Sequence, residues 1–166
     1  MSYVLNAFVI VFLVILQTTL AREITLFQGS VDLVLVWLAA WALNSRDHST
    51  WLGAVLAFSL FGYISALPWY VYLITYVSII LLANYIRSKL WQSPLVSMFL
   101  IIIIGSLIYY LMSYLLMRFS GGNYQWNTVL TNVVLPSLTL NILLAAPIHT
   151  IVHDMMGWTS KEEVLE

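Results

Sequence analysis

The chain has 166 residues, of which 62% are hydrophobic and 8% are charged, whereas soluble domains carry about 25% charged residues. The net charge of −1 argues against electrostatic binding of nucleic acid, and the absence of cysteine excludes disulfides, thiolate metal sites and cysteine catalysis. This composition indicates an all-α integral membrane protein.

Charged side chains are missing from three long stretches of the chain. None lies between Asp47 and Arg87, between Lys89 and Arg118, or between Arg118 and Asp154, and each stretch exceeds the ~20 residues of a spanning helix. Together with the turn residues, the charges divide residues 1–166 into six apolar segments of one membrane domain. We therefore expect a six-transmembrane-helix bundle, with spans at about 3–20, 31–44, 51–67, 69–86, 94–117 and 129–153.

The first four segments differ in their ends and lengths. The first lacks the basic start and the cleavage site of a signal peptide, so we expect it to remain as a transmembrane helix. The second reaches only about 24 Å as a helix, so we expect it to stand upright or to thin the bilayer. The third and fourth share one uncharged run, and Pro68 in "SALPWY" (65–70) marks the expected hinge because proline cannot donate a backbone hydrogen bond.

The sixth segment contains Pro136 and Pro147, so we expect a kinked helix. Uncharged polar residues gather around the first proline. They could line a small cavity or bond to backbone carbonyls that the proline leaves free, and helix–helix hydrogen bonding is the favoured interpretation. These residues are Thr131, Asn132, Ser137, Thr139 and Asn141.

Asp32 stands at the start of the second apolar segment, where a carboxylate near hydrocarbon needs an explanation. Gly29 breaks the preceding chain, Ser30 is the expected N-cap, and Asp32 then falls in the first helical turn. There its charge faces the positive end of the helix dipole, which is worth about 0.3–1 kcal/mol at an exposed end. Capping is the favoured role, and contact with a specific partner is the alternative.

Few side chains in the expected spans could carry out chemistry. His149 and His153 share a helical face beside Asp154, a spacing that can hold a metal. The zinc-protease pattern needs a Glu after the first His, and Thr150 stands there, so contact with headgroups is favoured over metal binding. No paired acids and no nucleophile–base arrangement occur in the spans. We therefore expect no enzymatic activity and no cofactor.

The distribution of Lys and Arg predicts the orientation of the chain in the membrane. Four of these residues fall on one side of the expected bundle, and Arg22 and Arg118 fall on the other. Because short cytoplasmic loops are enriched in positive charge, both termini are expected in the cytoplasm. The four are Arg46, Arg87, Lys89 and Lys161.

Four stretches stand in order along the chain: "LQTTLA" (16–21), "QGSVDLVLVWLAAWAL" (28–43), "WLGAVLAFSLFGYISALPWYVYLITY" (51–76) and "LPSLTLNILLAAPIHTIV" (135–152). In order and spacing they resemble the bacterial rod shape-determining membrane protein family MreD. Ala57 replaces a glycine of the family pattern, and the family's hairpin acid is missing near Ser65, so the chain resembles a divergent member. The residues that match are Leu16, Gln17, Asp32, Leu33, Phe58, Gly62, Pro68, Asn141, Ala146 and Pro147.

The resemblance implies a non-enzymatic scaffold of the cell-elongation machinery in the bacterial cytoplasmic membrane. Proteins of this family associate with MreC, a single-span protein. They act with the glycosyltransferase RodA, its partner transpeptidase and the actin-like MreB in peptidoglycan synthesis and the control of rod shape. Membrane lipids are further expected partners. The candidate partner-interface or structural residues are Gln17, Asp32, Gly62, Pro68 and Asn141.

Two other functions stay open. The expected arrangement of six helices is similar to the S components of energy-coupling-factor vitamin transporters, so a vitamin-binding S component is the alternative. Those proteins carry an Ala-x-x-x-Ala docking face in helix one, and "NAFVIVFLVILQTTLA" (6–21) has no such pair. A membrane enzyme acting on lipid is the third possibility, and the shortage of reactive side chains argues against it.

Overall fold

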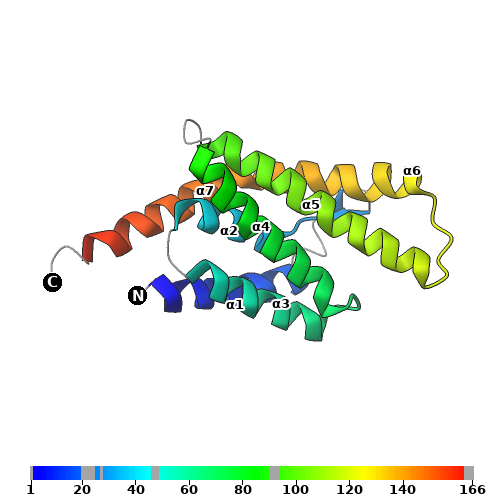
Figure 1. Ribbon diagram of the computed structural model, residues 1–166, viewed down its shortest axis with the longest axis horizontal. Coiled ribbons are helices and arrows are strands. Elements are labelled where there is room, and N and C mark those ends of the chain that lie inside the picture. Colours follow the sequence, from blue (N-terminus) through cyan, green and yellow to red (C-terminus); the bar gives the residue numbers. More distant parts are fainter. Residues whose placement is uncertain (1, 20–24, 27, 46–48, 90–93, 163–166) are drawn as a thin grey trace.

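The computed structural model of the chain describes residues 2–19, 25–26, 28–45, 49–89 and 94–162. Arg22 and Arg46, on which the expected orientation partly depends, lie outside these residues. The described residues fold into a helical bundle with a small two-stranded sheet (Figure 1). The elements are α1 (Ser2–Thr19), β1 (Thr25–Leu26), β2 (Gly29–Ser30), α2 (Leu33–Asn44), α3 (Ser49–Ile64), α4 (Trp69–Lys89), α5 (Pro94–Phe119), α6 (Trp126–Val129), the π-helix η1 (Leu130–Val134) and α7 (Leu135–Glu162).

Each of the six apolar segments identified in the sequence contains a helix, with ends that differ by a few residues from the expected ones. Among the described residues, three helical stretches are long and apolar enough to cross a membrane: Trp69–Ser88, Pro94–Phe119 and Trp126–Gly157. The helices over Tyr3–Thr19, Leu33–Asn44 and Ser49–Ile64 are apolar but shorter. The chain is therefore a helical, membrane-embedded protein.

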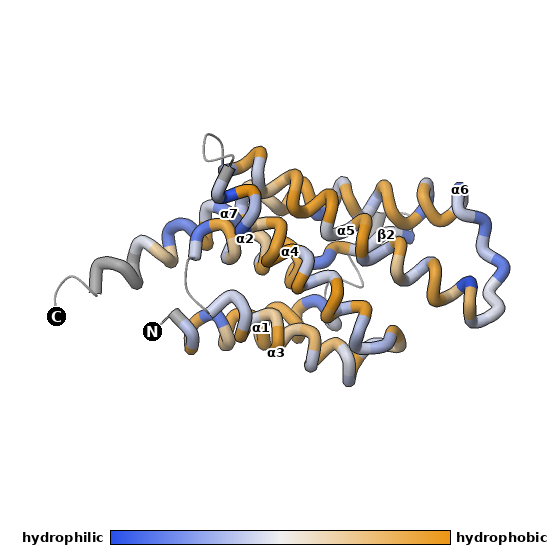
Figure 2. The backbone as a smooth tube through the Cα atoms, viewed as in Figure 1, coloured by the Kyte–Doolittle hydropathy of each residue, from blue (hydrophilic) through white to orange (hydrophobic). Residues whose placement is uncertain are grey.

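The outward faces of the helices are as apolar as a lipid environment requires. Val4 and Phe8 in α1 are 76% and 74% exposed, and Leu143 in α7 is 70% exposed. Figure 2 shows hydrophobic residues along the lengths of the helices and hydrophilic ones mostly toward loops and ends. Such extensive exposure of large apolar side chains would be costly in water and is normal in a bilayer.

Helix α2 lies at the centre of the bundle and contacts α1, α3, α4, α5 and α7. Every side chain from Val34 to Ala42 is at most 4% exposed. Other helices therefore cover this short segment on all sides, and its upright position or a thinned bilayer stays a prediction. Its 12 residues span only about 18 Å, so both of its ends lie where polar backbone groups need partners from the protein itself.

Helices α3 and α4 form a tight hairpin at the expected hinge. The chain turns at 65–67, and Pro68 directly precedes the first residue of α4. A Cβ added at Gly62 would lie 2.7 Å from the Cβ of Trp69, so glycine allows the two helices to approach closely. Phe61 stacks on Tyr72 across the hairpin, with ring centroids 5.1 Å apart.

The segment around Pro136 departs from α-helical geometry one turn before the proline. Residues Leu130–Val134 form a π-helix, and α7 follows directly. Pro136 has no backbone N–H to donate to the carbonyl of Asn132, four residues earlier. The backbone N–H of Gln28 donates to that carbonyl instead, at 3.1 Å. The carbonyl freed by the proline is thus used to hold the segment that leads into α2.

Candidate functional site at the buried start of α2

Asp32 is the N-cap of α2. Its Oδ1 accepts a hydrogen bond from the backbone N–H of Leu35 at 3.0 Å, and its side chain is only 7% exposed. The expectation that Ser30 is the N-cap is wrong, because Ser30 lies in β2 and its backbone N–H is bound to Ser137 Oγ at 3.0 Å. The helix therefore begins later than expected, and the carboxylate itself satisfies one of its free N–H groups.

Gln17, near the end of α1, binds both the capping carboxylate and a free backbone N–H at the start of α2. Its Nε2 donates to Asp32 Oδ1 at 3.2 Å, and its Oε1 accepts from the backbone N–H of Val34 at 3.1 Å. The side-chain amide of Gln17 therefore provides an acceptor for a second free N–H of α2 and orients the capping carboxylate. Burial of these polar groups is tolerable because each is hydrogen-bonded.

Asn141, from the second turn of α7, completes the arrangement from the other side. Its Oδ1 accepts from the backbone N–H of Asp32 at 2.8 Å, and its Nδ2 donates to Ser106 Oγ in α5 at 3.1 Å. Asn141 and Ser106 are both fully buried. We call Gln17, Asp32, Ser106 and Asn141 the α2 cluster, and it joins α1, α2, α5 and α7.

The extended segment 28–32 lies along the start of α7 and is held at alternate residues. The N–H groups of Gln28, Ser30 and Asp32 donate in turn to Asn132 O, Ser137 Oγ and Asn141 Oδ1. In an extended chain every second residue faces the same way, and in a helix about every fourth residue does. A strand and a helix can therefore form a regular series of contacts. Two of the polar side chains noted around Pro136 thus serve as acceptors for a strand.

Gly29 permits this close approach. A Cβ added at Gly29 would lie 2.7 Å from the backbone N of Ser137 and 2.9 Å from the Cβ of Pro136. Both distances are shorter than a real Cβ contact allows. Any larger residue would therefore push the strand away from α7 and lengthen the three hydrogen bonds.

The structure brings three of the five candidate residues together. Gln17, Asp32 and Asn141 belong to the α2 cluster, whereas Gly62 and Pro68 lie in the α3–α4 hairpin. Sequence reasoning did not identify Ser106, and the only signal for it was a hydroxyl beside Gly105 in a run of isoleucines.

A pocket of about 320 Å³ adjoins the α2 cluster at the end of the bundle where α1 ends and α4 begins. Gln17 is common to the pocket and the cluster. The lining combines side chains with hydroxyl or amide groups and apolar side chains in similar numbers. The residues that line it are Gln17, Thr18, Ser30, Val31, Phe61, Ile64, Ser65, Ala66 and Tyr72.

A half-buried arginine binds the opposite end of α2. Arg87 of α4 donates to the carbonyl oxygens of Ala42 and Ser45, which lie at the end of α2. Nearby, Asn6 accepts from Trp37 Nε1 at 3.1 Å and donates to the carbonyl of Ser49 at 2.9 Å. A cation at a helix C-terminus is stabilised by the negative end of the helix dipole. The sequence identified Arg87 only through its charge and did not predict this contact.

The two histidines near the end of α7 lie on one face, as their spacing predicted. The ring centroids of His149 and His153 are 6.4 Å apart and nearly parallel. His153 Nδ1 lies 3.7 Å from Asp154 Oδ1, and both side chains are largely exposed. Among the described residues no group of three or more His, Cys, Asp or Glu side chains could hold a metal ion.

The α2 cluster can position helices and can present polar atoms to a neighbouring molecule. Its members are amides, a hydroxyl and a capping carboxylate, and no nucleophile is paired with a base among them. Comparisons with protein-family models, with curated proteins and with solved structures find no match for this chain.

Proposed function

We propose that the chain is a non-enzymatic membrane scaffold of the bacterial cell-elongation machinery that resembles the MreD family. In this role it spans the cytoplasmic membrane with six helices in an S-component-like arrangement, with both termini in the cytoplasm. It binds an MreC-like single-span protein and supports peptidoglycan synthesis by a RodA-type glycosyltransferase, its transpeptidase and MreB.

One observation carries the proposal. Gln17, Asp32 and Asn141, which match three separate motifs of that family, are joined by direct hydrogen bonds although Asp32 and Asn141 are 109 residues apart in the chain. Short motifs in an apolar sequence can match by chance. A direct contact between their polar residues supports the proposal, because it gives three separate motifs one shared place in the fold.

Deletion in a rod-shaped bacterium that encodes this chain tests the proposal. We expect rods to become spheres and the wild-type chain, supplied in trans, to restore rods. The tagged chain should also copurify an MreC-like protein from detergent-solubilised membranes. Rod shape that persists in a clean deletion without a paralogue would contradict the proposal.

Asp32→Asn separates partner binding from capping. Asparagine caps helices as well as aspartate does, and its Oδ1 can still accept from Leu35 and Gln17, so the fold should be retained. If the carboxylate contacts the partner, this folded variant loses the MreC-like protein. If the variant retains the partner and rod shape, Asp32 acts only as the cap.

A vitamin-binding S component is the second candidate, and the pocket of about 320 Å³ favours it. Ligand sites for small molecules begin at about this volume. Protein purified without added vitamin would then carry a stoichiometric vitamin, detectable by denaturing extraction and mass spectrometry. The gene neighbourhood discriminates the two candidates cheaply, because an adjacent MreC-like reading frame favours the scaffold and adjacent transporter ATPases favour the S component.

A further inference from the structure

The described residues that line the pocket beside the α2 cluster are uncharged. None of them is Asp, Glu, Lys, Arg or His. A charged group that leaves water needs an opposite charge or several strong hydrogen bonds to offset its lost hydration. The lining therefore favours an uncharged occupant over a phosphate, a carboxylate or an ammonium group.

Several hydroxyl and amide groups in the lining have hydrogen-bonding capacity left. Ser65 Oγ accepts from Tyr72 Oη at 2.6 Å and from the backbone N–H of Leu67 at 3.2 Å, and its own proton has no acceptor among the described residues. Ser30 uses its backbone N–H to bind Ser137, so its exposed hydroxyl takes no part in that contact. Gln17 retains a second amide proton. An occupant with several hydroxyl groups could pair with all three.

The rest of the lining is apolar. Phe61, Val31 and Ile64 stand beside the polar groups, and Phe61 is held in place by stacking on Tyr72. A purely polar occupant would leave these carbon surfaces without partners. A sugar ring has hydroxyl groups around its edge and C–H groups on its faces, so it matches both halves of the lining.

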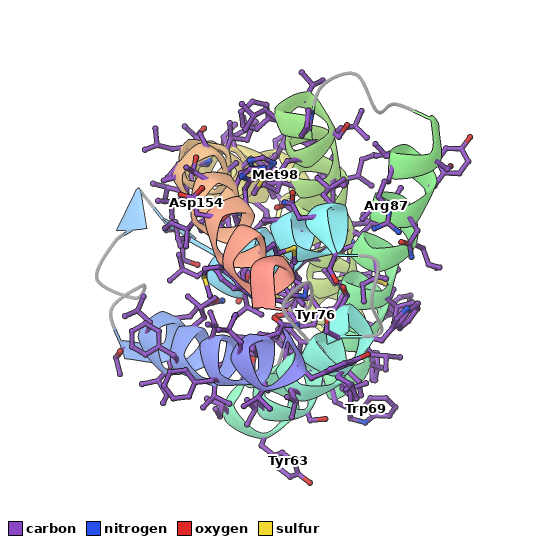
Figure 3. The ribbon with its side chains drawn as sticks, turned by 90° about the vertical axis from the view of Figure 1, so that its left-hand side faces the viewer. Tyr63, Trp69, Tyr76, Arg87, Met98 and Asp154 are labelled. Atoms are coloured by element: carbon purple, nitrogen blue, oxygen red, sulfur yellow. The ribbon has the colours of Figure 1, made fainter. Side chains whose placement is uncertain are left out.

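The pocket lies at the depth of lipid headgroups. Tyr63, Trp69 and Tyr70 flank its lining segments in the chain and are 93%, 56% and 40% exposed. Figure 3 shows Tyr63 and Trp69 pointing outward from the bundle. Tyrosine and tryptophan favour the membrane–water interface. The pocket mouth is therefore level with the headgroups rather than with the hydrocarbon.

We propose that this pocket binds the uncharged sugar headgroup of a membrane glycolipid. Gln17, Ser30 and Ser65 hydrogen-bond the hydroxyl groups, and Phe61 contacts the ring carbons. The acyl chains remain in the bilayer beside α1 and α3. The site stands independently of the scaffold role, since it needs no protein partner.

Native mass spectrometry of the full chain tests the site. The protein is purified in lauryldimethylamine oxide, which carries no sugar, and is mixed with glucosyl diacylglycerol, diacylglycerol or phosphatidylglycerol. We expect a one-to-one adduct with the glucosyl lipid that is favoured about tenfold over the other two. Equal binding of the three lipids would overturn the proposal. Competition by methyl glucoside identifies the free sugar as sufficient, and retained selectivity without competition identifies the membrane-anchored headgroup as the ligand.

Two variants and one control locate the binding. Ala66→Trp fills the pocket from an exposed turn position and should reduce glycolipid binding about tenfold. Ser30→Leu removes one hydroxyl and leaves the backbone contact to Ser137, so it serves if the first variant fails to fold. Ala146→Trp is the matched control, because Ala146 is exposed on α7 and outside the lining. Wild-type binding by both pocket variants would overturn the assignment.

Discussion

Tyr76 and Tyr72 are neighbours on α4 that differ in one respect. Both side chains are at most 5% exposed, and their ring centroids are 6.1 Å apart. The Tyr72 hydroxyl donates to Ser65, whereas the buried Tyr76 hydroxyl has no hydrogen-bond partner among the described residues. Figure 3 shows Tyr76 in the interior of the bundle. A buried hydroxyl without a partner loses its hydration and gains nothing in return.

We therefore expect Tyr76→Phe to raise the free energy of unfolding by about 1 kcal/mol and Tyr72→Phe to lower it by about 1 kcal/mol. Thermal unfolding in detergent micelles, followed by circular dichroism, compares the two variants directly. Destabilisation by Tyr76→Phe would indicate that a bound water satisfies the hydroxyl of the wild-type chain.

Asn141 should be the most sensitive member of the α2 cluster. Asn141→Leu keeps the volume and leaves the buried N–H of Asp32 without an acceptor, which costs about 2–3 kcal/mol. Ser106→Ala removes only the acceptor for Nδ2 and should cost about 1 kcal/mol. Unfolding midpoints of the two variants measure the difference. Equal losses would show that the bond to Ser106 matters as much as the bond to the strand.

At the residue scale the sequence was informative about which side chains matter and less so about their partners. Gln17, Asp32 and Asn141 were selected because they match motifs of the family that the sequence resembles. The capping rule alone favoured Ser30, because the rule cannot sense that Ser137 holds this residue in a strand. Asp32 caps the helix through the N–H of Leu35, and its own N–H is bound to Asn141, 109 residues away.

At the scale of elements, the strand laid along α7 makes Gly29 far less replaceable than other glycines. Gly29→Ala places a Cβ against Ser137 and Pro136, so we expect a loss of about 1–3 kcal/mol. Gly157→Ala is the control, because a Cβ there meets nothing within 4 Å and alanine favours helix by about 0.5–1 kcal/mol. Chemical or thermal unfolding should move the two variants in opposite directions. A neutral Gly29→Ala would mean that the strand can lift from the helix at little cost.

Helix positions and the α3–α4 hinge could be predicted from apolar runs and from Pro68. The π-helix Leu130–Val134 could not. The proline predicted a break, but neither the π-helix nor the bond from the N–H of Gln28 to the carbonyl of Asn132 was predicted. A distant donor of this kind leaves no trace in local sequence periodicity.

At the scale of the whole molecule, the enclosure of α2 was the feature least accessible to the sequence. The sequence of a short helix that is apolar on every side is the same whether lipid or protein surrounds the helix. Ala39 is fully buried in the structure, so Ala39→Phe should overpack the core and cost about 1–3 kcal/mol. The same change at the exposed Ala146 should stay within about 0.5 kcal/mol. Unfolding midpoints of the two variants measure the difference. An unchanged midpoint for Ala39→Phe would indicate that α2 faces lipid.

The start of α1 and the end of α7 lie at the same end of the bundle (Figure 1), as the proposed six membrane crossings require. With the proposed orientation, a cysteine at Asp47 should react with an impermeant maleimide only after the cells are opened. A cysteine at Gly121, in the turn after α5, should react in intact spheroplasts. Labelling of position 47 from outside would invert the topology.

The hydrogen bonds between segment 28–32 and α7 can form only after α7 has been synthesised. The acceptor for the Asp32 N–H is translated 109 residues after its donor, which takes on the order of 5–20 s at ordinary elongation rates. During that interval the N–H of Asp32 needs another acceptor, such as water, the translocon or a chaperone. Until η1 and α7 are made, the N–H groups of Gln28, Ser30 and Asp32 lack their acceptors. Synthesis of α7 therefore completes the hydrogen bonds that hold the segment leading into α2.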